Sequence, residues 1–442
     1  MSQKPTLHAA LPVPPGTSER RARLVATPEQ RAILAKAAAG TRISVAEAHA
    51  IVDAPFAELA AAADARRRAV TDPDVVTYVV DRNINYTNVC NVLCDFCGFY
   101  RTEKEKDAYT LSIEQVIDKI APLEAIGGTQ VLLQGGLNEA LPLAHMEQMF
   151  AAVRERFPGM DIHSLTATEI EFYAEQEGLT FAQVIERLRA SGLKSLPGGG
   201  MEILADEVRE AVSPLKTKAD VYLQVHEEFH KLGMTTTATM MFGMGESWAH
   251  RLDHLDKIRT LQDGSGGAEP KREPKGFTAF IPWTFQTDGS TRLKRPPATA
   301  DEYLRVIAMS RLFLDNFAHI QAGWVTEGPR IAQMALSCGA DDWGGILMEE
   351  NVISAAGTLF GMDPPTARRY LRELGYTPAQ RNTYYKILQR FDDATPDEKP
   401  HDIGQLDVHL GKVGNRGRGV AVKLGGTRQP VQFGKSDATN AD

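Results

Sequence analysis

The segment Asn88-Val-Cys-Asn-Val-Leu-Cys-Asp-Phe-Cys-Gly-Phe-Tyr100 contains three of the four cysteines in this chain of 442 residues. A cubane iron–sulfur cluster normally takes four thiolate ligands. Here Cys90, Cys94 and Cys97 provide three, and Cys338 lies far along the chain without a cysteine neighbour. The spacing therefore indicates a cluster with one iron left open for a ligand that is not protein.

Two other kinds of site explain this segment less well. A structural zinc site needs a fourth Cys or His at finger-like spacing, and the next histidine, His145, is remote. A cluster that only carries electrons needs four ligands. The pattern favours the open cluster over both.

The composition is that of a cytoplasmic enzyme. The chain is 43% hydrophobic and 24% charged, with a formal net charge of −8, so nucleic acid is not an expected partner. Clustered cysteines argue for a reducing compartment. We find neither a signal-like N-terminus nor an apolar stretch long enough to span a membrane.

The pattern of residues divides the chain into four parts. Residues 1–26 lack periodicity and are expected to form a flexible arm. Capping boxes at Thr27 and Ser44 open Ala-rich helices, which predicts a helical N-terminal cap over 27–74. Residues 396–442 are rich in glycine and are expected to be a flexible tail.

Between the cap and the tail, residues 75–395 alternate between strand and helix patterns. The expected strands are Val75–Asn85, Val131–Leu133, Met160–Leu165, Leu193–Leu196, Thr235–Phe242, Phe277–Trp283 and Ile320–Trp324. About seven β/α units favour an α/β fold with a parallel TIM-like (β/α) barrel or partial barrel. Catalytic groups of such barrels lie at the carboxyl ends of the strands.

With Phe96 before its last cysteine, the Cys-x3-Cys-x2-Cys run resembles the radical S-adenosylmethionine (SAM) superfamily. The resemblance implies a [4Fe–4S] cluster on Cys90, Cys94 and Cys97, and SAM bound to the open iron with its adenine beside Phe96. It also implies that reduced cluster cleaves SAM to a 5′-deoxyadenosyl radical, which takes hydrogen from a substrate. A low-potential donor such as flavodoxin or ferredoxin would supply the electron.

Five further segments are similar to one branch of this superfamily, which makes menaquinone by the futalosine route or the deazaflavin chromophore of a redox coenzyme. These segments are Leu133–Asn138, Gly192–Gly200, Glu202–Leu204, Thr239–Gly243 and Glu349–Val352. The resemblance covers residues 70–395.

Within the branch, Phe280–Gln286 and Gly323–Gly328 are most similar to the cyclic dehypoxanthinyl futalosine synthases. Sister enzymes, aminofutalosine synthase and the deazaflavin synthase subunits, tend to carry a leucine-type residue at the position of Trp283. Their activities are the alternative functions for this chain. The resemblance implies dehypoxanthine futalosine as substrate. Its ribose C4′ would lose hydrogen, the carbon radical would add to the benzoate ring, and loss of an electron and a proton would give the cyclic product.

The same resemblance implies cofactor-binding residues. Gln134, Gly135 and Gly136 match the position whose backbone meets the methionine end of SAM, and Thr168 and Glu169 match the region near its ribose. Glycines allow close approach of the backbone to a ligand. A plain turn between strand and helix is the alternative for Gly135 and Gly136.

Two further residues are candidates for the substrate site. Glu246 follows a strand and is a candidate to bond a ribose hydroxyl or to accept the proton that is lost, with a helix-capping carboxylate as the alternative. Trp283 is a candidate wall for the benzoate ring, with a core position as the alternative. The family usually has a histidine where Met244 stands, so a mechanism that uses that histidine is in doubt here.

Overall fold

The computed structural model of the chain describes residues 25–266, 275–287, 291–357 and 360–392. The expected tail, 396–442, lies outside these residues, as does the expected arm, 1–26, except for its last two residues. The division of the chain into arm, cap, barrel and tail stays a prediction.

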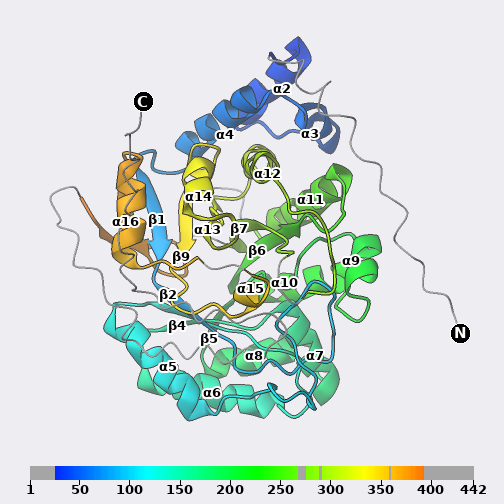
Figure 1. Cartoon of the computed structure of the whole chain (residues 1–442), viewed down its shortest axis with the longest axis vertical. Coiled ribbons are helices and arrows are strands. Elements are labelled where there is room, and N and C mark those ends of the chain that lie inside the picture. The colour runs from blue at the N-terminus through cyan, green and yellow to red at the C-terminus, as the bar shows by residue number, and fades with distance from the viewer. Residues whose placement is uncertain (1–24, 267–274, 288–290, 358–359, 393–442) are drawn as a thin grey trace, which may run out of the picture.

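Three helices pack together at one end of the molecule (Figure 1). They are α2 (Pro28–Ala38), α3 (Val45–Ile51) and α4 (Phe56–Val70), and α4 lies against α12 (Ala300–Phe313). The side chains of Thr27 and Ser44 accept hydrogen bonds from the backbone N–H of the third residue of α2 and of α3, respectively. The side chains of those two third residues in turn accept hydrogen bonds from the backbone N–H of Thr27 and Ser44. Both predicted capping boxes are therefore confirmed.

The main sheet of the described residues has seven parallel strands in the order β2-β3-β4-β5-β6-β7-β8. Their bounds are β2 (Asp81–Ile84), β3 (Gln130–Leu133), β4 (Asp161–His163), β5 (Leu193–Leu196), β6 (Thr235–Phe242), β7 (Phe277–Thr284) and β8 (His319–Ile320). A parallel α/β fold is thus confirmed.

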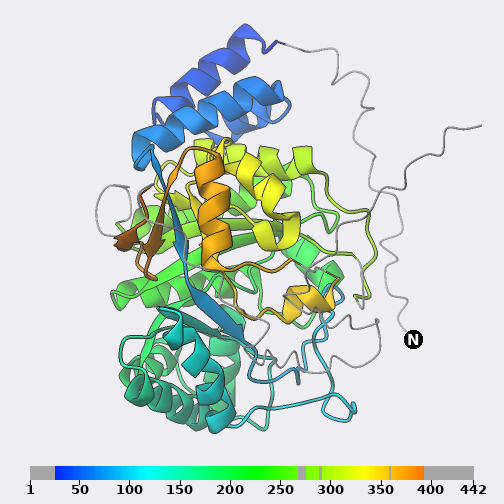
Figure 2. The same ribbon diagram turned by 60° about the vertical axis from the view of Figure 1, so that its left-hand side comes forward.

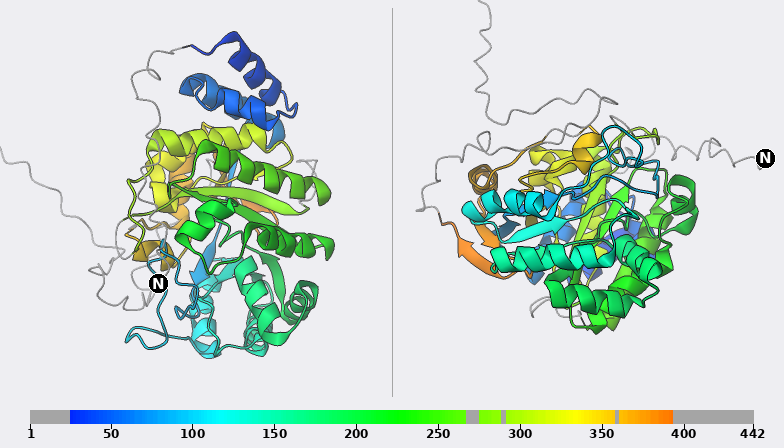
Figure 3. Two further views of the ribbon diagram at one scale, coloured as in Figure 1. Left: turned by 90° about the vertical axis from the view of Figure 1, so that its right-hand side faces the viewer. Right: turned by 90° about the horizontal axis from the view of Figure 1, so that it is seen from below.

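Helices cover the outer face of this sheet (Figure 3). They include α5 (Ile113–Ala125), α6 (Leu143–Arg156), α7 (Ala167–Glu177), α8 (Phe181–Ser191), α9 (Asp206–Val212), α10 (Ala219–Lys231) and α11 (Trp248–Gly264). Among the helices of the described residues, none combines the length and the apolar character that a membrane crossing needs.

A second sheet closes the first into a ring. It contains β1 (Val75–Val79), β9 (Asp342–Gly345), β10 (Thr377–Arg381) and β11 (Ile387–Arg390), in the order β11-β10-β1-β9. Gln321, directly after β8, bridges to Asp342, and β9 pairs with β1, which continues through Val80 into β2. The N–H of Ile346 donates to the carbonyl of Val79 at 2.9 Å. Hydrogen bonds therefore run around a barrel, as expected for a TIM-like fold.

Two of the predicted strands differ in detail from the observed ones. The expected strand Val75–Asn85 is divided at Val80 into β1 and β2, which belong to different sheets. The expected strand Ile320–Trp324 is wrong beyond Ile320, because Trp324 begins the short helix α13 (Trp324–Glu327). The N–H of Gly323 donates to the Tyr303 hydroxyl at 2.6 Å, so it makes no strand hydrogen bond.

The last described part of the chain was not predicted as strand. After α14 (Pro329–Leu336), α15 (Val352–Ala355) and α16 (Pro364–Glu373), β10 and β11 form an antiparallel hairpin. The Arg381 guanidinium donates to both oxygens of Asp342, at 2.6 and 2.9 Å, and both side chains are buried. This ion pair ties the hairpin to β9.

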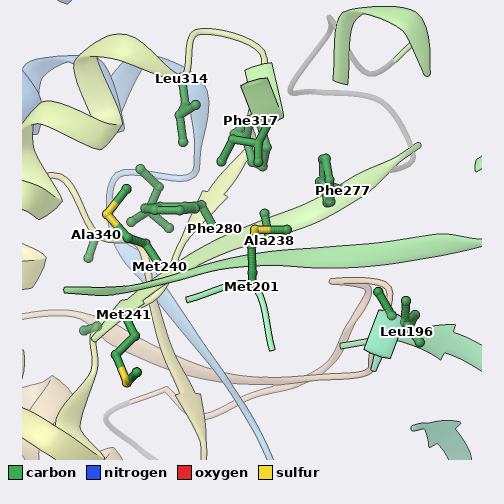
Figure 4. Packing of buried hydrophobic residues seen from close by; sticks show 14 of the residues in the cluster. Leu196, Met201, Ala238, Met240, Met241, Phe277, Phe280, Leu314, Phe317 and Ala340 are labelled. Carbon is green, nitrogen blue, oxygen red and sulfur yellow. The ribbon is translucent and has the colours of Figure 1, made fainter. Parts of the chain in front are cut away.

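The apolar core fills the space outside the barrel strands. Because side chains alternate along a strand, Ala238 and Met240 of β6 point away from the lumen that Thr239 lines. Figure 4 shows them packed with Phe277 and Phe280 of β7. All eight residues of β6 are buried, as in a central strand of a covered parallel sheet.

We predict that Asp342→Asn lowers the free energy of unfolding by about 3–5 kcal/mol, because it leaves the buried Arg381 charge unpaired. Urea titration measures the loss. Asp253→Asn is the matched control, since Asp253 is half-exposed and pairs with Lys257 at the surface, where a pair contributes about 0–1 kcal/mol. Equal losses in the two variants would contradict this account of the hairpin.

Candidate active site

A cavity of about 440 Å³ lies in the lumen of the barrel. Its wall extends from the cysteine segment at one end to Arg381 and Tyr385 of the β10–β11 hairpin at the other. Figure 2 shows the segment between β2 and α5 beside α15, and residues of both segments line the cavity. Since barrel enzymes place their catalytic groups at the carboxyl ends of the strands, this cavity is the candidate active site.

The cysteine loop is held by backbone hydrogen bonds and by one buried arginine. The N–H of Cys90 donates to the carbonyl of Arg101 at 2.9 Å, and the N–H of Cys97 donates to the carbonyl of Cys94 at 3.2 Å. The Arg101 guanidinium donates to all three carbonyls of residues 98–100. Arg101 thus fixes the chain directly after the last cysteine, a role that no sequence motif indicated.

The three predicted cluster ligands all line this cavity. Burial raises the pKa of the Cys94 thiol to about 12 and that of Cys97 to about 11, so both hold their protons until a metal withdraws charge from sulfur. Three thiols on one wall match the donor set of a cubane cluster with an open iron.

Gly135 and Gly136 let the loop after β3 approach the cysteine loop. A Cβ atom on Gly136 would lie 2.1 Å from the carbonyl oxygen of Val89 and 2.7 Å from the Cβ of Cys90. A Cβ on Gly135 would lie 2.6 Å from the ring of Tyr86. Both glycines and Gln134 line the cavity, so close packing beside the cysteines requires glycine here.

Thr168 and Glu169, at the start of α7, present polar atoms without partners. One oxygen of Glu169 accepts hydrogen bonds from the Tyr86 hydroxyl at 2.7 Å and the Gly135 N–H at 3.2 Å. Among the described residues, its other oxygen and the Thr168 hydroxyl have no partner, although both are buried and both residues line the cavity. Burial raises the pKa of Glu169 to about 7. Because buried polar atoms are normally hydrogen-bonded, these two atoms indicate a site for a polar ligand.

Phe96 lies near an ion pair that the sequence analysis did not single out. The ammonium nitrogen of Lys216 is 5.2 Å from the centre of the Phe96 ring and 2.6 Å from a carboxylate oxygen of Glu202. All three residues line the cavity. The residues are far apart in sequence, so no local motif could have joined them.

Glu246 is not among the residues that line the cavity. Its two oxygens accept hydrogen bonds from the N–H groups of Gly243 and Met244, each at 2.9 Å, and Arg251 also donates to it. These contacts hold the turn after β6. They favour the structural carboxylate that was the alternative, and the catalytic role of Glu246 stays a prediction.

Met244, the position where the family usually has histidine, is 1% exposed and packs in the hydrophobic core. It does not line the cavity. Met244 therefore does not occupy a place in the cavity where it could replace the histidine of the family.

The wall formed by β7 and α13 is aromatic. Trp283 lines the cavity, and so do Trp324, Val325 and Thr326. The indole N–H of Trp324 donates to the carbonyl of Gly345 on β9 at 2.9 Å, which fixes the ring. The two segments that resemble the cyclases most closely thus meet at one cavity.

The polar residues late in the barrel serve mainly as structural partners. Glu349 pairs with Arg82 and Lys119, and Asp341 pairs with Arg311. Glu350 lines the cavity, yet its oxygens accept three backbone N–H groups at the start of α15.

Solved structures share the fold. Methylornithine synthase superposes with a TM-score of 0.62 at 17% identity, over 78% of this chain and 97% of that one. The FeFe-hydrogenase maturase HydG from Carboxydothermus hydrogenoformans has a TM-score of 0.64 at 17% identity, over 81% and 80%. This likeness concerns the fold alone.

Curated relatives are much more similar. A cyclic dehypoxanthine futalosine synthase of Streptomyces coelicolor is 42% identical over 369 residues, 83% of this chain and 90% of that protein. The synthase of the same name from Halalkalibacterium halodurans is 38% identical, over 83% and 97%. A 5-amino-6-(D-ribitylamino)uracil–L-tyrosine 4-hydroxyphenyl transferase of Methanocaldococcus jannaschii is 37% identical, over 75% and 92%.

Two family models match the chain. The model of the Radical SAM superfamily matches residues 84–258, which include the cysteine loop and β3 to β6, and that of the CofH/MqnC C-terminal region matches residues 274–393. Together with relatives of this identity over most of its length, they show that the chain belongs to the radical SAM superfamily, in the branch with the CofH/MqnC C-terminal region.

Proposed function

We propose that this chain is a radical SAM enzyme that converts dehypoxanthine futalosine to its cyclic product in menaquinone biosynthesis. The observation that carries the proposal is the identity of 42% and 38% to two synthases of that name, each over 83% of this chain. The site supports it, since Trp283 and Trp324, from the two segments most similar to the cyclases, line the cavity.

As a member of the superfamily, the chain uses a [4Fe–4S] cluster and SAM. When bound, these cofactors supply a 5′-deoxyadenosyl radical that takes hydrogen from ribose C4′ of the substrate. Cys90, Cys94 and Cys97 would hold the cluster, because their thiols share one cavity wall and number one fewer than a fully ligated cubane needs.

The neighbouring residues would bind SAM. The backbone of Gln134, Gly135 and Gly136 packs beside Cys90 and would meet the methionine end. The unpartnered carboxylate oxygen of Glu169 would accept a hydrogen bond from a ribose hydroxyl of SAM, and the Thr168 hydroxyl would accept or donate one. Phe96, on the same wall as the cysteines, would contact the adenine.

The remaining lumen would take the substrate. The chain must hold the ribose and the aromatic ring in contact and exclude water while an unpaired electron is present. An enclosed barrel lumen meets both requirements. Trp283 would form a wall against the benzoate ring, where an aromatic face adds about 0.5–1.5 kcal/mol beyond area burial.

A second candidate function is the hydroxyphenyl transfer of the archaeal relatives, favoured by 37% identity over 75% of this chain. The test is anaerobic reconstitution followed by separate incubations with dehypoxanthine futalosine, with tyrosine plus the ribitylaminouracil, and with the substrate of aminofutalosine synthase. Mass spectrometry should find product with the first alone. A hydroxyphenyl adduct would overturn the cyclase proposal.

An electron donor of low potential, such as flavodoxin or ferredoxin, and a cytoplasmic location stay part of this proposal. The donor follows from the need to reduce a cluster with an open iron. The location follows because thiols are kept reduced in the cytosol.

We predict that replacing any one of Cys90, Cys94 and Cys97 by Ala abolishes formation of 5′-deoxyadenosine and lowers the amount of bound iron. Two thiolates cannot hold a cubane with one open iron. Iron analysis and electron paramagnetic resonance of the reduced protein measure the second effect without turnover. Cys338→Ala is the control, since Cys338 is a buried core residue outside the cavity. Loss of iron in that control would contradict the three-ligand assignment.

We expect Glu169→Gln to weaken SAM binding by about 10- to 100-fold, since a hydrogen bond to a charged group contributes about 1.5–3 kcal/mol. Equilibrium dialysis with labelled SAM gives the affinity. Glu177→Gln, on the exposed face of the same helix, is the control. Unchanged affinity in Glu169→Gln would remove this residue from the cofactor site.

A further inference from the structure

A histidine in the lumen has one ring nitrogen fixed and the other without a partner. His163 is the last residue of β4 and lines the cavity. Its Nδ1 lies 2.5 Å from the hydroxyl oxygen of Ser195 on β5. Its Nε2 makes no hydrogen bond with any described residue. When Nδ1–H donates to Ser195, Nε2 presents its lone pair.

The strand register places this histidine level with a second polar group, which lies two strands away in the same sheet. Asn83 on β2 pairs with Leu132 on β3, and the register that pairs Val131 with Ile162 brings Leu132 level with His163. The side-chain oxygen of Asn83 is buried and has no partner in the described part of the chain, and Asn83, Leu132 and His163 all line the cavity. Strands two apart lie about 10 Å from each other, which leaves room for an aromatic ring over Leu132.

The carboxylates of the cavity wall are held by other partners or lie in the region that we assign to SAM. Both oxygens of Asp81 accept hydrogen bonds, from a backbone N–H and a glutamine amide. Glu350 accepts three backbone N–H groups. One oxygen of Glu202 pairs with Lys216 and the other has no hydrogen-bond partner among the described residues, but Lys216 lies over Phe96, in the region that we assign to SAM. Glu169 keeps a free oxygen, but it lies beside Gly135 in the region that we assign to SAM. His163 is the remaining base.

We propose that His163 is the catalytic base that accepts the proton lost from the aromatic ring during cyclisation, an assignment that rests on the proposed cyclase function. Ser195 is a positioning residue that holds the imidazole ring through Nδ1. General bases within hydrogen-bond reach of the departing proton accelerate such steps by about 10²–10⁴-fold.

The step breaks one C–H bond and forms one N–H bond. After C4′ has bonded to the ring, the attacked ring carbon still carries its hydrogen, and the ring holds one unpaired electron. Proton transfer to Nε2 leaves the C–H electron pair in the ring as a radical anion. The radical anion would give one electron to an external one-electron acceptor, such as an oxidised iron–sulfur protein, and the ring would be aromatic again. The imidazolium returns its proton to water when product leaves.

Burial, together with the charge of Arg381, lowers the pKa of His163 to about 3. The imidazole is therefore neutral at physiological pH and its lone pair is available. The same low pKa makes the imidazole a weak base, so the driving force for the proton transfer comes from the aromaticity that the ring regains when the electron leaves.

The test counts cyclic product formed for each 5′-deoxyadenosine in the reconstituted full chain. In His163→Gln, hydrogen abstraction still proceeds, so we expect 5′-deoxyadenosine formation within about threefold of the unmodified protein, while cyclic product per 5′-deoxyadenosine falls about tenfold or more. Ser195→Ala should show a smaller fall. Added imidazole should restore product in His163→Ala, since it supplies the missing base.

His230→Gln is the matched control. His230 is a partly buried histidine, but both its ring nitrogens are hydrogen-bonded, to Ser265 and Thr236, and it does not line the cavity. Equal uncoupling in this control, or full coupling with only a raised KM in His163→Gln, would overturn the assignment. If the unmodified protein forms no cyclic product at all, the proposed function fails instead, which is a separate outcome.

Discussion

The hydrogen bonds of β9 to both of its neighbours are the constraint on which the rest of the structure depends. Gln321 after β8 bridges to Asp342, and β9 pairs in parallel with β1. Without these contacts the seven-stranded sheet would be an open half-barrel with one face exposed to water. With them the strands enclose a lumen, and a reaction that proceeds through unpaired electrons needs such shielding from other hydrogen donors.

The cysteine loop depends on this frame as well as on its own sequence. Arg101 holds the carbonyls after the last cysteine, and the absence of a side chain on Gly136 admits the neighbouring loop to within contact of Cys90. The unpartnered oxygens of Thr168 and Glu169 face the same cavity. Under the proposed function, the cysteine wall would hold the cluster, the neighbouring wall would bind the hydroxyl groups of SAM, and the remaining lumen would take the substrate.

The parts that could be predicted from the sequence are local ones. The capping boxes at Thr27 and Ser44 are confirmed because a cap is decided by four consecutive residues. The parallel barrel follows from the alternation of strands and helices. The strand β9 was missed because Asp-Trp-Gly-Gly has no β-branched pattern, and only its distant partners make it a strand.

The roles of single polar residues were harder to predict, because they depend on partners far apart in sequence. Glu246 read equally well as a catalytic or a structural carboxylate, and its contact with Arg251 and two N–H groups favours the second. His163 gave no signal at all, since a histidine at a strand end is as often a core residue. Only the strand register and its free Nε2 single it out.

The most direct test of the central claim is the fate of the ribose hydrogen. Dehypoxanthine futalosine carrying deuterium at C4′ would be incubated with the reconstituted, reduced protein and SAM, and 5′-deoxyadenosine would be analysed by mass spectrometry. The account predicts one deuterium in 5′-deoxyadenosine and its absence from the cyclic product. Unlabelled 5′-deoxyadenosine formed alongside cyclic product would contradict it.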